Sequence, residues 1–365
     1  MRSSSRANRL AGRTSLPQPP GGKGTFRRTG CLAICIAAFA GLPVASANDG
    51  DTFPWPQAAA SEVNIATDMP DALRASVEQN TRLLSFGMVR NGKLVIEHYQ
   101  NGASRETYGN IASATKSVLA LLVGIAIDRG AIASVDQKLI DFFPELQEAG
   151  IDPEARTLTL AHLLTMSAGW QVRSTDMPPA TATDALRRRM AFAPGKVFQY
   201  DNASSHLVAI AVARATGMSL EAFADEHLLR PLGIDRYIWG KDKNGNTLGW
   251  SGLQLRLLDL LKIGELVLLH GLWHGRRIVS ESWINEMLTA RNEGGPPVGI
   301  PYAYQWYVQR TPDLRHHSAM AIGSGGQFLY LVPDLRLVVA ITHTREQRSA
   351  DFGFMRTLVL PAIHP

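Results

Sequence analysis

The sequence is nearly without cysteine. Its 365 residues include only Cys31 and Cys35, and both lie in an N-terminal stretch that we expect to be removed. A chain with no cysteine after that point cannot form a disulfide bond, use a thiol nucleophile or hold a metal through thiolates. The mature protein is therefore expected to depend on packing for its stability.

Acidic residues are absent from residues 1–47, which hold seven of the 37 basic residues of the chain. Without this stretch, 30 basic residues face 32 acidic ones, so the net charge falls from +5 to −2. The basicity thus belongs to the N-terminal stretch, and no basic patch indicates a nucleic-acid partner. A composition that is 45% hydrophobic and 19% charged is typical of a globular chain of one large or two modest domains.

Residues 1–47 have the pattern of a secretory signal peptide. A basic stretch ends at Arg27 and Arg28, an apolar run covers residues 31–40, and the small residues 45–47 form a cleavage site. The apolar run is short for a membrane span, so we expect no stable span after its removal. The sequence therefore predicts an exported protein, periplasmic or secreted, with a linker at residues 48–61 and one domain at 62–365. It carries no signal for an oligomeric state.

A complete Gly-x-Ser-x-Gly motif is also absent. Residues 249–252 come nearest but fail at Leu253, and they are predicted to form a turn. His270 and His274 stand four residues apart, but Gly271 and the lack of an acidic residue between them argue against a metal site. The sequence predicts neither a metal nor an organic cofactor.

Two hairpins are predicted near the ends of the chain. Residues 85–97 are predicted to form two strands joined by a turn at Asn91 and Gly92. Near the C-terminus, apolar strands are predicted at 327–332 and 335–342, joined by a Pro-Asp turn. Residues 134–264 between them are mostly helical in pattern, and a further helix is expected at 352–360. This order predicts an α+β fold with a mixed antiparallel sheet flanked by helices and an inserted helical lobe.

Ser113 and Lys116 stand three residues apart where a long apolar run begins. One helical turn would place both side chains on one face, where the amine can take the hydroxyl proton and make the serine a nucleophile. Residues 118–127 are apolar on every side of such a helix, which predicts that the helix is buried. A Ser-x-x-Lys pair alone is equally typical of a helix start with a surface lysine, so the assignment depends on further motifs.

Two further motifs follow this pair. Tyr200 and Asn202 form a Tyr-x-Asn pattern before a predicted helix, 87 residues after Ser113. A glycine-rich turn at residues 323–327 precedes a predicted strand, and its Ser324 lies 124 residues after Tyr200. Taken singly, the first could be a capping turn and the second a plain strand entry. Together with the serine and lysine they supply a nucleophile, a base and a proton donor for a leaving group.

In order and spacing, these motifs resemble the serine beta-lactamase and penicillin-binding-protein superfamily. The closer match is its class C-like branch, which includes esterases, D-aminopeptidases and 6-aminohexanoate-dimer hydrolases. The resemblance extends from about residue 86 to the C-terminus and includes the connecting segments 163–169, 194–196 and 304–306. It implies a beta-lactamase/transpeptidase-like fold and a serine hydrolase that cleaves a small ester or amide through an acyl-enzyme.

The resemblance also implies a role for each motif. Ser113 would be the nucleophile, Lys116 the base in acylation, and Tyr200 the group that passes a proton to the leaving group. The oxyanion hole would combine the Ser113 N–H with an N–H of the glycine-rich turn, donated by Gly326 or by Gln327. The further substrate-binding or oxyanion residues that the resemblance implies are Asn202, Ser324, Gly325, Gly326 and Gln327.

One departure from the family pattern concerns the third motif. Beta-lactamases have Lys-Thr-Gly there, and its cation holds the carboxylate of the drug, whereas this chain has residues 323–325, Gly-Ser-Gly. The missing cation favours an ester or an unactivated amide. Two alternatives stay open: a beta-lactamase or peptidoglycan DD-peptidase, and a non-catalytic cell-wall or peptide-binding sensor of the same fold. The intact serine, lysine and tyrosine argue against the sensor.

The remaining aromatic and histidine residues near these motifs have two interpretations. His316 and His317 precede the glycine-rich turn and could line the pocket or be exposed loop residues. Trp170, Tyr304 and Trp306 are predicted to be packing residues rather than substrate contacts.

Overall fold

The computed structural model describes residues 55–148, 150–171, 181–344 and 353–364. Residues 49–365 form one compact unit. Residues 1–48 form a second unit that lies wholly outside the described residues, and with it the predicted signal peptide.

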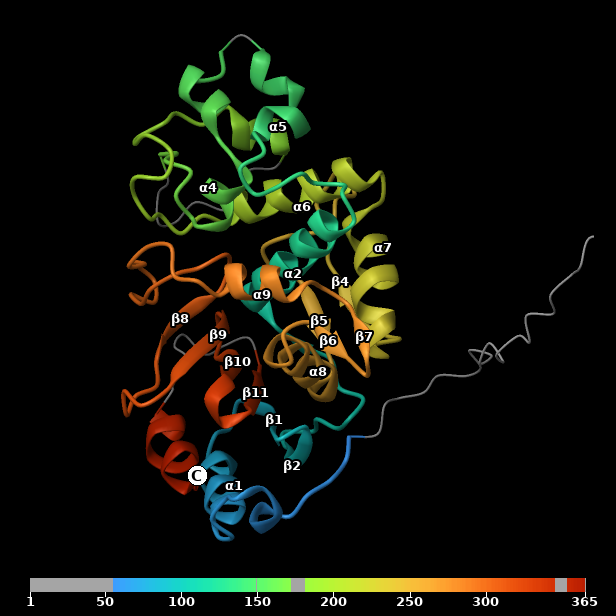
Figure 1. Ribbon diagram of the computed structural model, residues 1–365, viewed down its shortest axis with the longest axis vertical. Helices are drawn as coiled ribbons and strands as arrows, with labels where there is room; N and C mark the ends of the chain where they lie inside the picture. Colours follow the sequence, from blue (N-terminus) through green and yellow to red (C-terminus); the bar gives the residue numbers. More distant parts are fainter. Residues whose placement is uncertain (1–54, 149, 172–180, 345–352, 365) are drawn as a thin grey trace, which may run out of the picture. The chain divides into compact units, whose positions relative to one another are not determined.

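A six-stranded antiparallel sheet forms the centre of the compact unit (Figure 1). Its strand order is β2-β1-β11-β10-β9-β8, so strands from the two ends of the chain pair in its middle, with Phe86 opposite Ile341. Asn91 and Gly92 have φ values of 52° and 73°, as the turn of the predicted N-terminal hairpin requires. Both predicted hairpins are confirmed. The strands are β1 (Leu83–Arg90), β2 (Lys93–Tyr99), β8 (Tyr307–Arg310), β9 (His317–Gly323), β10 (Gln327–Val332) and β11 (Leu337–His343).

Both faces of this sheet are covered. Phe86 and Met88 point into an apolar cluster with α1 (Met69–Glu78) and the C-terminal turns, which lie together in Figure 1. Gly87, between them, faces α8 (Leu257–Leu268), because successive residues of a strand point to opposite faces of the sheet. A Cβ on Gly87 would lie 2.8 Å from Leu261 Cδ1, so glycine lets α8 approach closely.

The helix that follows Ser113 is buried as predicted. α2 (Thr115–Asp128) packs against α6 (Asn202–Thr216) and α9 (Glu281–Met287). Trp283 Nε1 donates to the Ala120 carbonyl at 3.0 Å, and a Cβ on Gly124 would lie 2.0 Å from the same indole. Glycine is therefore required where α2 and α9 cross.

The rest of the described middle is helical with short strands. The expected helical lobe at 134–264 includes β4 and β5, which pair with β3, outside the lobe, in a small sheet of order β3-β5-β4. The end of the lobe includes α8, which packs on the main sheet. Gly217, with a φ of 68°, ends α6. The remaining elements are α3 (Leu139–Phe142), α4 (Leu160–Leu164), α5 (Ala182–Leu186), α7 (Leu220–Ala224), β3 (Gly109–Asn110), β4 (Ile238–Trp239), β5 (Leu253–Leu255), β6 (Leu272–Trp273), β7 (Arg276–Arg277), and the C-terminal turns Met355–Val359 and Leu360–Ala362.

Among the described residues, no single helix is long and apolar enough to cross a membrane. One pair of helical segments, Asn202–Thr216 and Leu220–Leu232, reaches that length and composition only when its halves, bent by 76°, are taken together.

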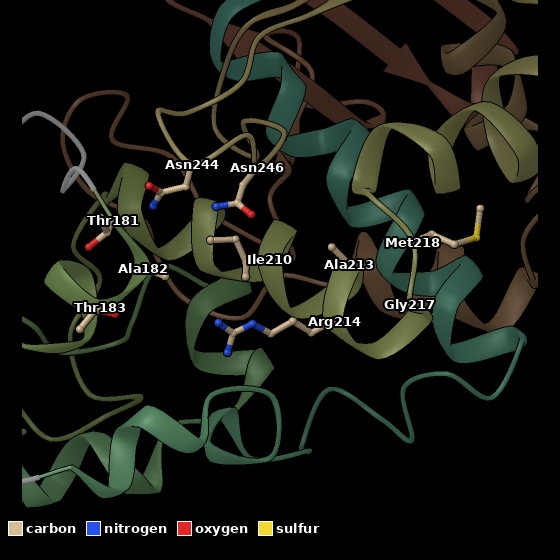
Figure 2. Close-up of a pocket in the computed structure, with 10 residues that line it drawn as sticks. All are labelled: Thr181, Ala182, Thr183, Ile210, Ala213, Arg214, Gly217, Met218, Asn244 and Asn246. Carbon is tan, nitrogen blue, oxygen red and sulfur yellow. The ribbon is translucent and has the colours of Figure 1, made fainter. Parts of the chain in front are cut away.

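A pocket of about 510 Å³ lies beside the C-terminal end of α6 (Figure 2). Its lining mixes neutral polar side chains, Asn244 and Asn246 among them, with apolar ones such as Ile210 and Met218. The one guanidinium in this lining, that of Arg214, binds Glu145 at 2.7 and 3.0 Å, so its charge is compensated.

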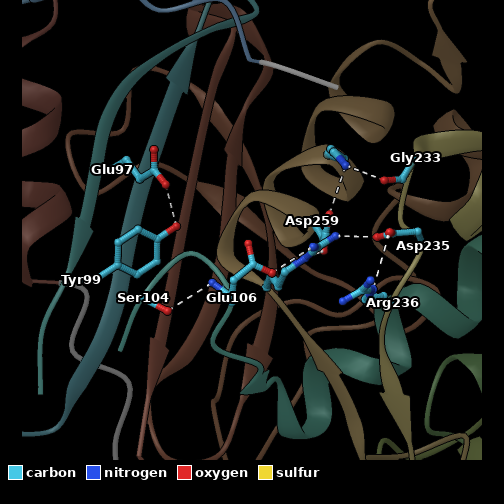
Figure 3. Close-up of polar contacts among 10 residues, drawn as sticks. Glu97, Tyr99, Ser104, Glu106, Gly233, Asp235, Arg236 and Asp259 are labelled. Carbon is cyan, nitrogen blue, oxygen red and sulfur yellow. Dashed lines mark hydrogen bonds and ion pairs between the residues drawn. The ribbon is translucent and has the colours of Figure 1, made fainter. Parts of the chain in front are cut away.

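A buried ion network ties α8 to the neighbouring loops (Figure 3). Arg256 donates to Asp259 at 2.7 Å and to Asp235 at 2.8 Å. Lys262 donates to Asp259 at 3.1 Å and to the Gly233 carbonyl at 2.8 Å. Each buried charge has an opposite partner, which such burial requires.

Candidate active site

Ser113 lies on a short 3₁₀ turn, Ala112–Ala114, directly before α2. The sequence predicted an unbroken helix start here, and the structure differs because Ala112 has a φ of 47°. The Asn110 side chain accepts the Ala112 N–H at 2.9 Å and stabilises this conformation. A left-handed alanine costs about 1 kcal/mol or more, and such strain is typical of functional turns.

Lys116 extends from the first turn of α2 toward Ser113. Its amine lies 3.2 Å from Ser113 Oγ and donates to Asn202 Oδ1 at 2.8 Å and to the Trp250 carbonyl at 2.9 Å. The residue is only 2% exposed, and this burial lowers the pKa of Lys116. The Tyr200 hydroxyl and the Asp201 carboxylate act in the opposite direction and raise that pKa.

Tyr200 and Asn202 reach the amine from the start of α6. The amine lies 4.9 Å from the centre of the Tyr200 ring, and Asn202 is the first residue of the helix. The helix begins here because Asp201 is its N-cap and accepts the N–H groups of Ala203 and Ser204 at 3.1 and 3.0 Å. The structure thus brings Ser113, Lys116, Tyr200 and Asn202 together.

Arg188 belongs to this arrangement, although the sequence analysis missed it. Its guanidinium binds the Asp201 carboxylate in a two-pronged ion pair at 2.6 and 3.1 Å and lies 4.7 Å from the centre of the Trp170 ring. Asp201 stands between Tyr200 and Asn202 in the sequence, so its ion pair with Arg188 holds in place the backbone that carries both residues. No local sequence signal joins an arginine to an aspartate 13 residues away.

Trp250 is the second contact that the sequence analysis missed. It belongs to the segment 249–252, which was expected to be only a turn, and its carbonyl accepts from Lys116. Gly249 is needed there because a Cβ would lie 2.3 Å from the Ser205 carbonyl. The nearby His206 side chain pairs with Asp242 at 3.0 Å, which fixes the preceding loop on α6.

The glycine-rich turn lies beside the nucleophile through Gly323. A Cβ on this residue would lie 2.2 Å from the Ile111 carbonyl and 3.1 Å from Ala112 Cβ, so the end of β9 presses on the Ser113 turn. Ser324 is exposed, and Gly325 and Gly326 have φ values of 88° and 86°.

Gln327, in contrast, points into the sheet. Its side chain is 1% exposed and bonds both backbone groups of His343, at 3.0 and 3.1 Å. The His343 ring nitrogen Nδ1 lies 2.8 Å from the Gly326 carbonyl, and since a carbonyl only accepts, Nδ1 must carry the proton. Burial lowers the pKa of His343, which favours this neutral form. Gln327 and His343 thus hold the turn in place.

His316 and His317, which precede the glycine-rich turn in the sequence, lie away from Ser113. β9 extends from His317 to Gly323, so its two ends are about 20 Å apart. His316 contacts Asp334 at 3.3 Å at the far end. The structure does not bring His316 and His317 to the site. Trp170, Tyr304 and Trp306 are buried, as predicted.

The sequence of this chain is similar to that of proteins of one known family. A family profile described as "Beta-lactamase" matches residues 69–363. The chain belongs to the beta-lactamase family. As a member, it is a serine hydrolase, and the predicted family and α+β fold are confirmed.

Among relatives in the family, the 6-aminohexanoate-dimer hydrolase of Paenarthrobacter ureafaciens is 26% identical over 300 residues, which is 74% of each chain. A family VIII carboxylesterase has a similar structure, with a TM-score of 0.68 and 20% identity over 84% of this chain and 98% of that one. A class C beta-lactamase from Rhodobacter sphaeroides has a TM-score of 0.60 and 18% identity over 78% and 95%.

Proposed function

We propose that this hydrolase cleaves an ester or amide through an acyl-enzyme on Ser113, with Lys116 as the base. The observation that carries the proposal is the hydrogen-bonding of the lysine amine. A neutral amine has two hydrogens and one lone pair. The Asn202 side-chain oxygen and the Trp250 carbonyl can only accept, so they take the two hydrogens and leave the lone pair toward the Ser113 hydroxyl.

The steps follow from this geometry. Lys116 takes the Ser113 proton as Oγ bonds to the substrate carbonyl carbon, and the carbonyl oxygen becomes an oxyanion. As that intermediate collapses, the bond to the leaving alcohol or amine breaks, and the Lys116 proton passes to it through Tyr200. Water then attacks the acyl-enzyme, gives its proton to the same groups, and releases the acid and free Ser113.

The oxyanion requires backbone donors near Ser113. We propose the Ser113 N–H together with an N–H of the turn that begins at Gly323, since that turn presses on the nucleophile's own turn. The side chain of Gln327 is already bonded within the sheet, so this residue can contribute only its backbone.

The substrate class follows from the charges of β9. No lysine or arginine occurs from Ser318 to Gly326, so the third motif offers no partner for a substrate carboxylate. A carboxylate taken into such a site loses solvation and gains little. A neutral acyl group avoids that penalty, which favours a simple ester or amide over a penicillin. The names of the relatives, a 6-aminohexanoate-dimer hydrolase and a family VIII carboxylesterase, support the same class.

The test compares kcat/KM for a short-chain p-nitrophenyl ester, a linear amide dimer and benzylpenicillin. We expect the ester or the amide to be hydrolysed with at least a hundredfold higher efficiency than the lactam. Equal or better efficiency on benzylpenicillin would favour the beta-lactamase or DD-peptidase alternative. No turnover of any of the three, with no labelling of Ser113, would favour the sensor.

We also propose that the protein is exported. The support is the basic, then apolar, then small-residue pattern of residues 1–47. N-terminal sequencing of the protein from the periplasm or medium should give a chain that starts at Asn48. An uncleaved chain that stays in the cytoplasm would contradict the proposal.

A further inference from the structure

A second pocket, of about 380 Å³, lies at the opposite end of α2 from the active site. Lys116 and Asp128 are 12 residues apart on this helix, so about 18 Å of helix separates the two sites. The pocket is lined by residues from three elements: the end of α2, the helical turn that carries His227, and the segment from β7 to the start of α9.

The rim of this pocket is strongly basic. Arg129, Arg276 and Arg277 all line it, with His227 among them and Asp128 as the one carboxylate in the lining. That carboxylate is engaged, since it accepts the Ser280 N–H at 2.7 Å. Three guanidinium groups therefore share one concave surface on a chain whose net charge beyond residue 47 is −2.

In the described part of the chain, two of these arginines make no ion pair, and the lining holds three guanidinium groups against one carboxylate. Within the described ranges, neither Arg129 nor Arg276 makes an ion pair, while Arg277 donates to the His270 carbonyl. Both guanidinium groups line the same pocket as the His227 imidazole, and burial, then the charges of Arg129 and Arg276, lower the pKa of His227. Glu226, 3.6 Å from that ring, only partly offsets this effect. Like charges gathered in this way repel one another unless an anion lies between them.

The shape and chemistry of the pocket select the anion. Guanidinium groups bind phosphate oxygens through paired hydrogen bonds. Two guanidinium groups and an imidazole can together bind a tetrahedral group of charge −1 to −2. The inner wall is apolar, because Ile125 and Ile278 line it and the His227 ring packs on Phe223 with centres 4.8 Å apart. We propose that this pocket binds a phosphoryl group through Arg129, Arg276 and His227, either on a free phosphate compound or on a phospholipid headgroup.

The first arm of the experiment is isothermal titration calorimetry of the purified protein at low salt, with inorganic phosphate and with glycerol phosphate as the probes. A second arm measures sedimentation with vesicles of phosphatidylglycerol and of phosphatidylcholine. The test variant is R129Q/R276Q, and the matched control is R74Q/R236Q, which removes the same charge from exposed arginines elsewhere. Because none of the four side chains is buried, both variants should fold, and the melting temperature checks this.

Saturable phosphate binding that weakens at least tenfold in R129Q/R276Q but not in the control would support the proposal with a free phosphate as ligand. Binding only to phosphatidylglycerol vesicles, lost in the same variant, would support it with a lipid as ligand. No saturable binding in either arm, or equal loss in both variants, would overturn it. The proposal does not depend on the catalytic roles of Ser113 or Lys116, so either can fail without the other.

Discussion

Arg188→Ala tests the contact that the sequence did not reveal. The substitution removes the guanidinium from the Asp201 carboxylate, whose side chain is 8% exposed, and leaves that charge buried between Tyr200 and Asn202. Asp201 keeps three hydrogen-bond donors, the N–H groups of Ala203 and Ser204 and the Ser204 hydroxyl at 2.8 Å. The helix cap should therefore survive, strained but formed.

The size of the effect follows from the burial of the pair. Breaking a buried ion pair by removing one partner lowers the free energy of unfolding by about 3–5 kcal/mol. Because Asp201 keeps its other hydrogen-bond donors, we expect a decrease of about 3 kcal/mol, at the low end of this range. The charge that Arg188 no longer offsets also lies near Lys116, whose pKa Asp201 already raises. Since only the neutral amine acts as a base, the acid limb of kcat/KM should move to higher pH.

The assay measures thermal unfolding and the pH profile of ester hydrolysis for the wild type and the variant. Arg187→Ala is the matched control, because its partner Glu148 is 49% exposed and such surface pairs contribute at most about 1 kcal/mol. Guanidinium ion at millimolar concentration should partly restore Arg188→Ala and leave Arg187→Ala unchanged. If both variants lose the same stability and keep the wild-type acid limb, Arg188 does not position the catalytic motif.

Three further substitutions test other parts of the account. Lys116→Arg keeps the charge but not a neutral base, so turnover at pH 7 should fall by about a thousandfold or more; substantial residual activity in a folded variant would mean that the lysine acts by charge. Gly323→Ala would place a Cβ 2.2 Å from the Ile111 carbonyl, so the backbone of the Ser113 turn must shift. The melting temperature should fall, and kcat of the folded variant should fall by about a hundredfold or more through the oxyanion hole; an unchanged kcat would remove this turn from the site. Glu265 is 3% exposed, and burial raises the pKa of its carboxyl from 4.5 to about 7. The folded state therefore binds this proton more tightly than the unfolded chain, and wild-type stability should fall by about 3 kcal/mol between pH 4.5 and 7, whereas Glu265→Gln should lack this decline in denaturant titrations. Parallel pH profiles for the two proteins would show that Glu265 titrates normally.

Local patterns were sufficient for much of the fold. The Asn91-Gly92 turn predicted its hairpin because only a few residue types accept a positive φ at both positions. The apolar run after Ser113 predicted a buried helix, which α2 confirms. These signals are carried by neighbouring residues, so they can be read without the tertiary structure.

The parts of the site that escaped prediction depend on long-range contacts. Lys116 meets the Trp250 carbonyl 134 residues away, and His343 meets the Gly326 carbonyl across a hairpin. A backbone carbonyl has no sequence signature, since every residue has one. The left-handed conformation of Ala112 could not be predicted either, because alanine favours a helix. The contacts that accompany it, the Asn110 side chain and the packing of Gly323, appear only in the folded structure.

The central claim is that Ser113 forms the acyl-enzyme, and intact-protein mass spectrometry with a fluorophosphonate tests it most directly. The account predicts a single adduct that peptide mapping assigns to Ser113, is lost in Ser113→Ala, and forms far more slowly in Lys116→Arg. Labelling of Ser251, Ser324 or any other serine, or an undiminished adduct in Ser113→Ala, would contradict it.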